Sequence, residues 1–247
     1  MIREIQEGWD SVVLDVDGEW IVRVPRREEV REWIRREALL LPELASALPV
    51  PVPRFEVVED SDDVFFVAYR KLPGRPLGDP PVSIAAELGR FLVALHSFKT
   101  SVEVPRHRDP VDRFLGEVLP LLERDERRRA EAMFEQRLSP SGTVLLHADL
   151  GPPHILHEGS SVTGVIDWSD ASFGDRALDF AWLLNGTSAP FGAALLDAYC
   201  GEPDESLRER ALYYHRLGPW HEVLHGLEHD RPELVESGLE GVRARLP

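Results

Sequence analysis

The sequence predicts an α+β protein of two lobes, in which an N-terminal antiparallel sheet with one helix precedes a larger, mainly helical lobe. Short runs rich in β-branched residues, joined by turn residues, fill most of the first part of the chain, whereas helical patterns dominate the remainder. Between them, Leu72-Pro73-Gly74-Arg75-Pro76 interrupts regular structure. We therefore expect an N-terminal lobe at 1–72 with a hinge near 68–74, and a C-terminal lobe at 73–247.

Two strand pairs and one helix are expected in the N-terminal lobe. Apolar residues recur at roughly helical spacing from Glu28 to Leu48. Pro42 must kink or split that helix, because proline lacks an amide hydrogen and clashes with the preceding turn. The strands are expected on either side of it, at Val12–Val16, Trp20–Val24, Arg54–Glu59 and Val64–Arg70.

The C-terminal lobe is expected to be helical apart from one hairpin. Helical composition begins at Ala85–Phe98, and Asp109-Pro110 is typical of a helix start. A short hairpin is expected at Ile155–His157 and Val162–Ile166, around a Gly-Ser-Ser turn. Helices then dominate from Arg176 to the end of the sequence.

The composition describes an acidic protein with a formal net charge of -16. This charge argues against nucleic acid as the main partner, because phosphate backbones need basic stripes, and it favours cationic ligands. Acidity also serves solubility alone, so the charge does not decide the function. The single cysteine excludes an internal disulfide. No apolar run is long enough to cross a bilayer, and we expect a cytoplasmic monomer without a membrane partner.

The stretch from Leu145 to Leu156 places an aspartate, Asp149, in a proline-broken loop five residues before a potential metal ligand, His154. A second carboxylate, Asp167, ends an apolar strand, where strand pairing could return it beside the first loop. Phosphoryl transfer needs a carboxylate to deprotonate the attacking hydroxyl and a magnesium ion to neutralise charge on the phosphates. The sequence thus predicts a base and two metal ligands in one cleft.

The spacing matches the protein-kinase catalytic loop H-x-D-x-x-x-x-N followed by the metal-binding aspartate of D-F-G. With these motifs, nearly the whole chain resembles the aminoglycoside phosphotransferase family, a kinase-like fold that includes antibiotic kinases and small-metabolite kinases. The resemblance implies that Asp149 is the catalytic base, Asp167 the principal magnesium ligand and His147 a structural member of the loop.

His154 occupies a position where most of that family has asparagine. The branch that resembles macrolide and aminoglycoside 2''-phosphotransferases also has histidine there. Imidazole nitrogen is a poorer partner than oxygen for so hard a cation as magnesium. His154 is therefore expected to contact the metal or a phosphate, and the alternative is a purely loop-stabilising role.

Further residues follow from the same resemblance. Gly174–Ala181 is similar to the family stretch G-D-P-x-x-D-L-A, in which Asp179 would accept amide hydrogens of the catalytic loop. Asp170 could face the cleft near the metal, although a solvated loop aspartate is the simpler interpretation.

The nucleotide is expected to bind in the N-terminal lobe, with ATP and GTP both open. Gly8-Trp9-Asp10-Ser11 resembles the loop that covers the phosphates. Arg23 occupies the position of the kinase lysine that meets the α- and β-phosphates, and Glu37 could pair with it or be a helix-surface charge. The hinge, including Arg70 and Leu72, should pass its backbone along the purine base.

The acceptor is expected over Asp149, enclosed by the helices after Asp179, and His215, Trp220 and Glu222 are candidate contacts together with Asp170. His221 and His225 are four apart and could simply share one helix face. A zinc site at that pair is not expected, because no metalloprotease pattern accompanies it.

Three classes of function remain open from the sequence. A cationic aminoglycoside fits the acidic balance, and a macrolide would need a wide apolar pocket. A resident amino alcohol or sugar is the competing acceptor. A nucleotide-binding pseudokinase is suggested by Arg23 and His154, but the retention of Asp149 and Asp167 argues against it. A histidine-aspartate metal hydrolase is the weaker enzyme alternative.

Overall fold

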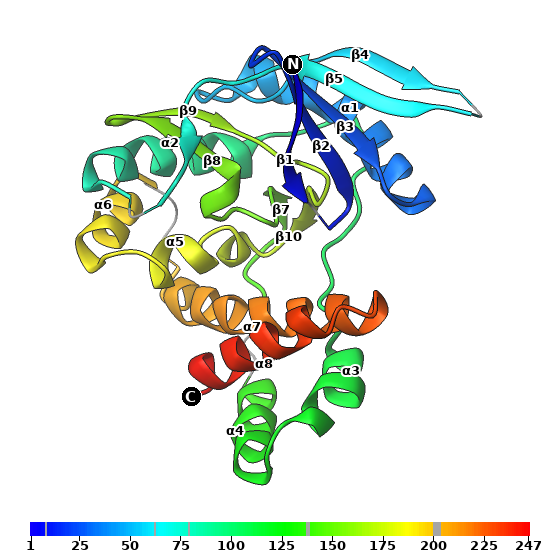
Figure 1. Ribbon diagram of the computed structural model, residues 1–247. Coiled ribbons are helices and arrows are strands. Elements are labelled where there is room, and N and C mark those ends of the chain that lie inside the picture. Colours follow the sequence, from blue (N-terminus) through cyan, green and yellow to red (C-terminus); the bar gives the residue numbers. More distant parts are fainter. Residues whose placement is uncertain (8, 62, 79, 137–138, 200–203) are drawn as a thin grey trace.

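The structure is a computed structural model, and it describes residues 1–247 apart from 8, 62, 79, 137–138 and 200–203. The N-terminal lobe is a five-stranded antiparallel sheet in the order β1-β2-β3-β5-β4 (Figure 1). The sequence did not predict β1, because its two isoleucines, Ile2 and Ile5, are three positions apart and do not show the alternation of a half-buried strand. The strands are β1 (Ile2–Glu7), β2 (Ser11–Val16), β3 (Trp20–Pro25), β4 (Phe55–Asp60) and β5 (Phe65–Arg70).

A single long helix, α1 (Glu28–Ala47), connects this sheet to the rest of the protein. Val30 and Ile34 pack against β5 in a small separate core. Later residues of the helix, such as Leu40, join the main core of the molecule. Pro42 lies inside the helix without ending it. The helix therefore fixes the position of the sheet relative to the C-terminal lobe.

Two small sheets carry the loops that matter for function. β7 (Val144–Leu146) pairs with β10 (Ser172–Gly174), and β6 (Arg75–Pro76) pairs with the hairpin of β8 (Ile155–Glu158) and β9 (Ser161–Val165). One loop connects β7 to β8 and another connects β9 to β10. Because β7 pairs with β10 and β8 pairs with β9, the two loops run close to each other (Figure 1). The hairpin predicted from the sequence is present.

Helices make up most of the C-terminal lobe, and Figure 1 shows α7 and α8 side by side below the small sheets. Gly226 and Gly238 permit this close packing, because an added Cβ would lie 2.8 Å from Val235 N and 2.9 Å from Val223 N, respectively. The helices are α2 (Ala85–Ser97), α3 (Val111–Arg113), α4 (Arg124–Glu135), α5 (Ala181–Asn185), α6 (Ala189–Tyr199), α7 (Leu207–Glu228) and α8 (Pro232–Arg245).

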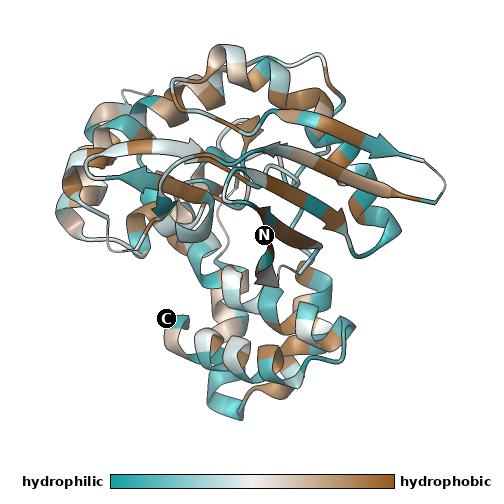
Figure 2. Ribbon diagram, turned by 45° about the horizontal axis from the view of Figure 1, so that its top comes forward, coloured by the Kyte–Doolittle hydropathy of each residue, from teal (hydrophilic) through white to brown (hydrophobic). Residues whose placement is uncertain are grey.

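Hydrophobic and hydrophilic residues alternate along most helices (Figure 2). The apolar sides of α2, α6 and α7 meet in one core, which includes Leu92, Phe180, Leu195 and Trp220. Within the described residues, no helix is long and apolar enough to cross a membrane. The α+β fold with an N-terminal antiparallel sheet and a mainly helical remainder is confirmed.

Candidate active site

Asp179 holds the loop that follows β7. Its buried carboxylate accepts hydrogen bonds from the backbone amides of His147 (3.0 Å) and Ala148 (2.9 Å). Ala148 has a φ of 70°, a left-handed conformation that is costly for alanine and that these bonds help to maintain. His96 on α2 also contacts Asp179 through Nε2 (3.2 Å) and Tyr199 through Nδ1 (2.8 Å). Sequence reasoning missed His96, which lies in no motif.

His147 connects this loop to the segment that contains Asp167. Its Nε2 donates to the carbonyl oxygen of Ile166 (3.0 Å), and its Nδ1 accepts from the amide of Asp149 (3.3 Å). One nitrogen therefore donates and the other accepts, as in a neutral imidazole. Burial, with the nearby imidazole of His154, lowers the pKa of His147 and maintains that neutral form. The residue orients backbone groups and has no atom left for chemistry.

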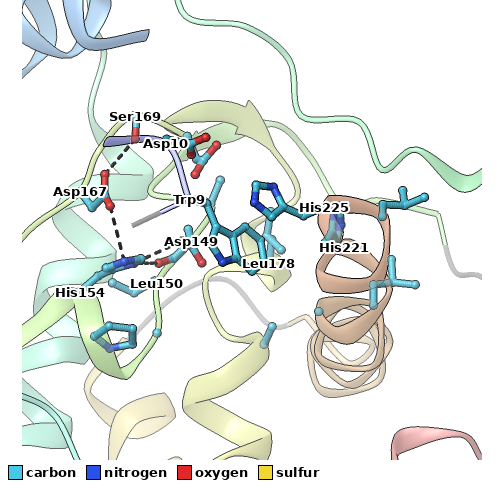
Figure 3. Close-up of a pocket in the computed structure, with 18 of the residues that line it drawn as sticks. Trp9, Asp10, Asp149, Leu150, His154, Asp167, Ser169, Leu178, His221 and His225 are labelled. Atoms are coloured by element: carbon cyan, nitrogen blue, oxygen red, sulfur yellow. Dashed lines mark hydrogen bonds and ion pairs between the residues drawn. The ribbon is translucent and has the colours of Figure 1, made fainter. Parts of the chain in front are cut away.

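Asp149, His154 and Asp167 lie together (Figure 3). His154 Nδ1 donates to the carbonyl oxygen of Asp149 (2.7 Å) and lies 3.3 Å from its carboxylate, while Nε2 lies 3.7 Å from a carboxylate oxygen of Asp167. Burial disfavours the charged imidazole, but the carboxylates of Asp149 and Asp167 outweigh it and raise the pKa of His154. In this arrangement the two carboxylates favour the protonated form of His154.

Asp167 occupies a second left-handed position, with a φ of 64°. Its Oδ1 accepts from Arg23 Nη2 (3.1 Å) and from Ser169 Oγ (2.9 Å). Burial opposes ionisation of this carboxyl, but the charges of Arg23 and His154 lower its pKa overall. The other oxygen, Oδ2, faces His154.

Arg23 and Glu37 form a buried ion pair. Arg23 Nη1 donates to both carboxylate oxygens of Glu37, at 3.0 and 2.9 Å, and the two side chains are 6% and 0% exposed. The amide of Trp168 also donates to Glu37 (3.3 Å). Since Arg23 bridges Glu37 and Asp167, one guanidinium fixes α1, β3 and the segment after β9 relative to one another. Glu37 is therefore not a helix-surface charge.

Asp170 opens on the same cleft and differs electrostatically from its neighbours. Desolvation in the cleft, together with the carboxylates of Asp149, Asp167 and Asp10, raises its pKa to about 7. At neutral pH a larger fraction of Asp170 is therefore protonated than of an ordinary aspartate.

A cleft of about 790 Å³ runs from β2 and β3 to α7 and is lined by residues of both lobes. Ser11 begins β2 at one end of it, and its buried hydroxyl has no hydrogen-bond partner among the described residues. Trp9 and Asp10 precede it, and Arg27 holds them by bonding the carbonyl oxygen of Trp9 (3.1 Å) and the carboxylate of Asp10. Gly8 of the expected phosphate-covering loop lies outside the described residues.

Two hinge residues named from the sequence have side chains outside the cleft lining. Arg70 is exposed, pairs with Glu19 (3.1 Å) and lies over the ring of Trp20 (4.1 Å). Leu72 packs against Gly164, where an added Cβ would come within 2.6 Å of its side chain. A nucleotide contact by their backbone stays a prediction.

At the other end of the cleft, α7 presents a different face from the one expected. Trp220 is fully buried, with ring centroids 5.8 Å from Phe114 and 5.1 Å from Phe134. Glu222 accepts from Ser237 on α8 (2.6 Å). Neither side chain lines the cleft, because Trp220 packs against Phe114 and Phe134 while Glu222 is bonded to α8. The expectation that they contact the acceptor is corrected.

His215 does line the cleft. Burial and the neighbouring charges of Arg245 and Arg216 lower its pKa to about 4, so that it is neutral at pH 7.

Asp109 is a cleft residue that sequence reasoning took only as a helix start. Its side chain is 2% exposed and lies 3.1 Å from His107 Nε2 and 3.9 Å from His221 Nε2. Burial opposes ionisation, but these two imidazoles lower the pKa of Asp109 well below its usual range. In the sequence, Asp109 was marked only by the proline that follows it. One of its two partners, His221, is more than a hundred residues away and could not be identified from the local sequence.

The chain is similar to known phosphotransferases in sequence and in fold. Residues 1–213 match the Phosphotransferase enzyme family (APH). The GDP and kanamycin complex of APH(2'')-IIIa has 23% sequence identity, covers 99% of this chain and 92% of its own, and has a TM-score of 0.88. A macrolide 2'-phosphotransferase from Brachybacterium faecium, in its apoenzyme form, has 25% identity, 98% and 91% coverage, and a TM-score of 0.78.

Two curated relatives are also similar over part of the sequence. An uncharacterized Bacillus subtilis protein, YcbJ, is 27% identical over 218 residues, which are 75% of this chain and 69% of that protein. A homoserine kinase from Methylobacillus flagellatus is 30% identical over 146 residues, which are 52% of this chain and 45% of the kinase. The match over residues 1–213 decides the family: the chain belongs to the phosphotransferase enzyme family and is a nucleotide-dependent phosphotransferase.

Proposed function

We propose that this phosphotransferase moves the γ-phosphate of ATP or GTP to a hydroxyl of a small molecule, with Asp149 as the base. The arrangement of Asp149, His154 and Asp167 supports this most directly, since His154 lies 3.3 Å from the Asp149 carboxylate and 3.7 Å from that of Asp167. The two carboxylates thus lie on either side of one imidazole, which supports roles as base and metal ligand in phosphoryl transfer.

The Asp149 side chain is 59% exposed and faces the cleft, where a hydroxyl can approach it. Asp149 would take the proton of that hydroxyl while the hydroxyl oxygen attacks the γ-phosphorus. A new P–O bond then forms on the acceptor, and the bond from the γ-phosphorus to the β–γ bridging oxygen breaks. The nucleoside diphosphate leaves with that electron pair.

A magnesium ion fits the donor atoms at the far side of His154. Asp167 would hold it through Oδ2, and His154 would add Nε2, which faces that oxygen. When bound, magnesium neutralises charge on the phosphates. Because the pKa of His154 is raised, ligation through Nε2 requires loss of its proton. The alternative is a protonated His154 that contacts a phosphate directly.

The nucleotide phosphates would lie between the N-terminal sheet and Asp167. Ser11 supports this, because its buried and unpartnered hydroxyl lines the cleft and could donate to a phosphate oxygen. Arg23 adds a fixed positive charge beside Asp167. We propose accordingly that residues 1–72 bind the nucleotide and that 73–247 supply the base, the metal ligands and the acceptor pocket.

The charges along the cleft favour an acceptor with few positive charges. Three of the six carboxylates that line it already have cationic or imidazole partners: Asp10 with Arg27, Asp109 with His107 and His221, and Glu228 with Arg113. Asp149 and Asp167 are reserved for the reaction, and Asp170 is only partly ionised at neutral pH. A polyamine would find few anionic contacts, so the acidic net charge of the chain is a poor guide to this pocket.

Among antibiotics, this balance favours a macrolide over an aminoglycoside, and a similar structure is that of a macrolide 2'-phosphotransferase. A resident amino alcohol or sugar is the second candidate, and the partial similarity to a homoserine kinase keeps a metabolite acceptor in view. A pseudokinase role is disfavoured, because Asp149 and Asp167 are both retained and lie on either side of His154.

The test is a panel of macrolides, aminoglycosides, amino alcohols and sugars, each incubated with ATP or GTP and magnesium and analysed for the mass gain of one phosphate. We expect gain on a macrolide or a weakly charged hydroxyl compound, and none with Asp149→Ala. Gain confined to polycationic aminoglycosides would contradict the acceptor class. Equal gain with Asp149→Ala would contradict the mechanism.

A further inference from the structure

Three side chains at the C-terminal end of α7 form a cluster apart from the Asp149 and Asp167 site. His225, Glu228 and His229 each offer one ligand atom, and these atoms all lie within 4.8 Å of one another. Residues three and four apart on a helix project from the same face, which explains why the three converge. All three line the cleft at its acceptor end. We call them the α7 histidine cluster.

The ring of His225 is held in place without use of its nitrogens. Trp9 stacks on it, with centroids 4.1 Å apart and planes 11° apart, and Figure 3 shows the two rings next to each other, to the right of Asp149. A stacking contact occupies the ring face, whereas metal ligands bind in the plane of the ring through nitrogen lone pairs. Neither imidazole ring makes a hydrogen bond to a residue that the structure describes. Both imidazoles are therefore oriented and available.

Glu228 can join them without leaving a charge unpaired. Its Oε1 pairs with Arg113 Nη1. Arg113 is also bound by Glu117 through two hydrogen bonds, of 2.7 and 3.0 Å, so its charge stays neutralised if Glu228 turns away. The side chain of Glu228 is 45% exposed and free to rotate.

We propose that the α7 histidine cluster binds a divalent transition-metal ion of the zinc class at the acceptor end of the cleft. Two imidazoles and one carboxylate suit zinc, whereas magnesium prefers oxygen ligands. Zinc bonds of about 2.0–2.1 Å put tetrahedral ligand atoms roughly 3.4 Å apart, so side-chain rotations within the cluster must bring the three atoms closer than the present limit of 4.8 Å. A fourth position is left open toward the cleft.

His221, the other histidine of the sequence pair, does not belong to the cluster. Its Nε2 faces Asp109 at 3.9 Å, one helical turn before His225. Burial and the neighbouring His229 lower the pKa of His225, which leaves it neutral and able to ligate at pH 7. The unfavourable expectation for zinc at the pair of His221 and His225 therefore does not extend to these three residues.

An ion in this cluster lies beside Trp9 of the loop before β2, opposite the base. It would fix His225 and occupy space at the acceptor entrance, so that zinc raises the KM for the acceptor and leaves nucleotide binding unchanged. The cluster is independent of the acceptor's identity and of the proposed base.

Calorimetric titration of the full chain with zinc, at saturating magnesium and nucleotide to occupy the Asp167 site, tests the proposal. We expect one zinc equivalent in the wild type, an affinity more than about tenfold weaker in His229→Ala, and an unchanged affinity in the matched control His221→Ala. Equal zinc affinity in the wild type and His229→Ala, or no zinc bound at all, would overturn it.

Nickel quenching of tryptophan fluorescence gives a second measurement. The ion would lie next to Trp9, so nickel should quench a fraction of the emission that disappears in Trp9→Phe and in His229→Ala, while His221→Ala retains it. Circular dichroism of each variant checks that it is folded. Quenching that is the same in His229→Ala and wild type would place the metal elsewhere and refute the cluster.

Discussion

The two ends of the cleft are built in different ways. At the catalytic end, loops next to short strands bring Asp149, His154 and Asp167 together, and each is held by contacts to backbone or to a buried charge. At the acceptor end, one face of α7 and the segment around Asp109 form the wall. The positions of the catalytic side chains are therefore determined mainly by the local loop sequence. The side chains of the acceptor wall depend instead on how α7 is rotated about its axis. The following variants compare the two ends.

The largest effect is expected for Asp167→Ala. Loss of this carboxylate removes the main oxygen ligand of the proposed magnesium site and the partner of Arg23 Nη2. Since a metal contributes several kcal/mol of transition-state stabilisation, we expect phosphate transfer to fall about 10³-fold. Isothermal titration should show that magnesium-dependent nucleotide binding is lost while metal-free nucleotide binding is retained. Magnesium-dependent binding equal to that of the wild type would exclude Asp167 as a ligand.

Asp179→Ala should mainly reduce stability. The substitution leaves the buried amides of His147 and Ala148 without their acceptor. An unsatisfied buried donor costs about 1–3 kcal/mol, so we expect the free energy of unfolding to fall by about 2–4 kcal/mol. Urea denaturation measures this. Asp170→Ala is the matched control in the same region, and a similar loss there would show that Asp179 has no special role in holding the loop.

His154 should make magnesium binding depend on pH. Its raised pKa means that the metal must displace a proton at neutral pH, so magnesium affinity should fall by up to about tenfold per pH unit as pH drops below that pKa. His154→Asn supplies an oxygen ligand and should remove this dependence. If both proteins show the same pH profile, His154 is not a metal ligand and the phosphate contact is favoured.

The metal-free protein should show the opposite trend in stability. A group whose pKa is raised on folding stabilises the folded state at low pH, and that contribution is lost as pH rises through the folded pKa. For His154 this means a decline in the free energy of unfolding above the unfolded value of about 6.5, absent in His154→Asn. Urea denaturation at several pH values tests the sign.

The smallest effect is expected at the face of α7 that turns away from the cleft. Glu222→Gln keeps the bond from Ser237 and should leave the acceptor KM unchanged within about twofold. His215→Ala, on the face that lines the cleft, should raise KM without changing kcat. Steady-state kinetics on an identified acceptor distinguishes the two. A larger KM effect for Glu222→Gln would mean that the acceptor reaches beyond the cleft described here.

The sequence predicted the catalytic end better than the acceptor end for a physical reason. Asp149, His154 and Asp167 lie within one loop–hairpin unit, so spacing and strand pairing determine that they are close. The strands and helices with clear apolar periodicity were likewise predictable. β1 was missed because Ile2 and Ile5 are three positions apart, so the segment lacks the period-two pattern of a strand.

Rotation of α7 was not predictable in the same way. Its buried face includes Tyr213, Leu217, Trp220 and Leu224, but aromatic and polar residues occur around the whole helix. Trp220 points away from the cleft because it packs against Phe114 and Phe134, and Glu222 because it bonds Ser237 on α8; all three partners are distant in the sequence. Asp109 depends similarly on His221, which is far away in the sequence.

The central claim is that Asp149 acts in the chemical step and not in nucleotide binding. Its most direct test measures, for Asp149→Ala and the wild type, the rate of phosphate transfer and the Kd for magnesium and nucleotide. We predict that the rate falls by about 10²–10⁴-fold and that Kd is unchanged. An unchanged rate in Asp149→Ala would contradict the account.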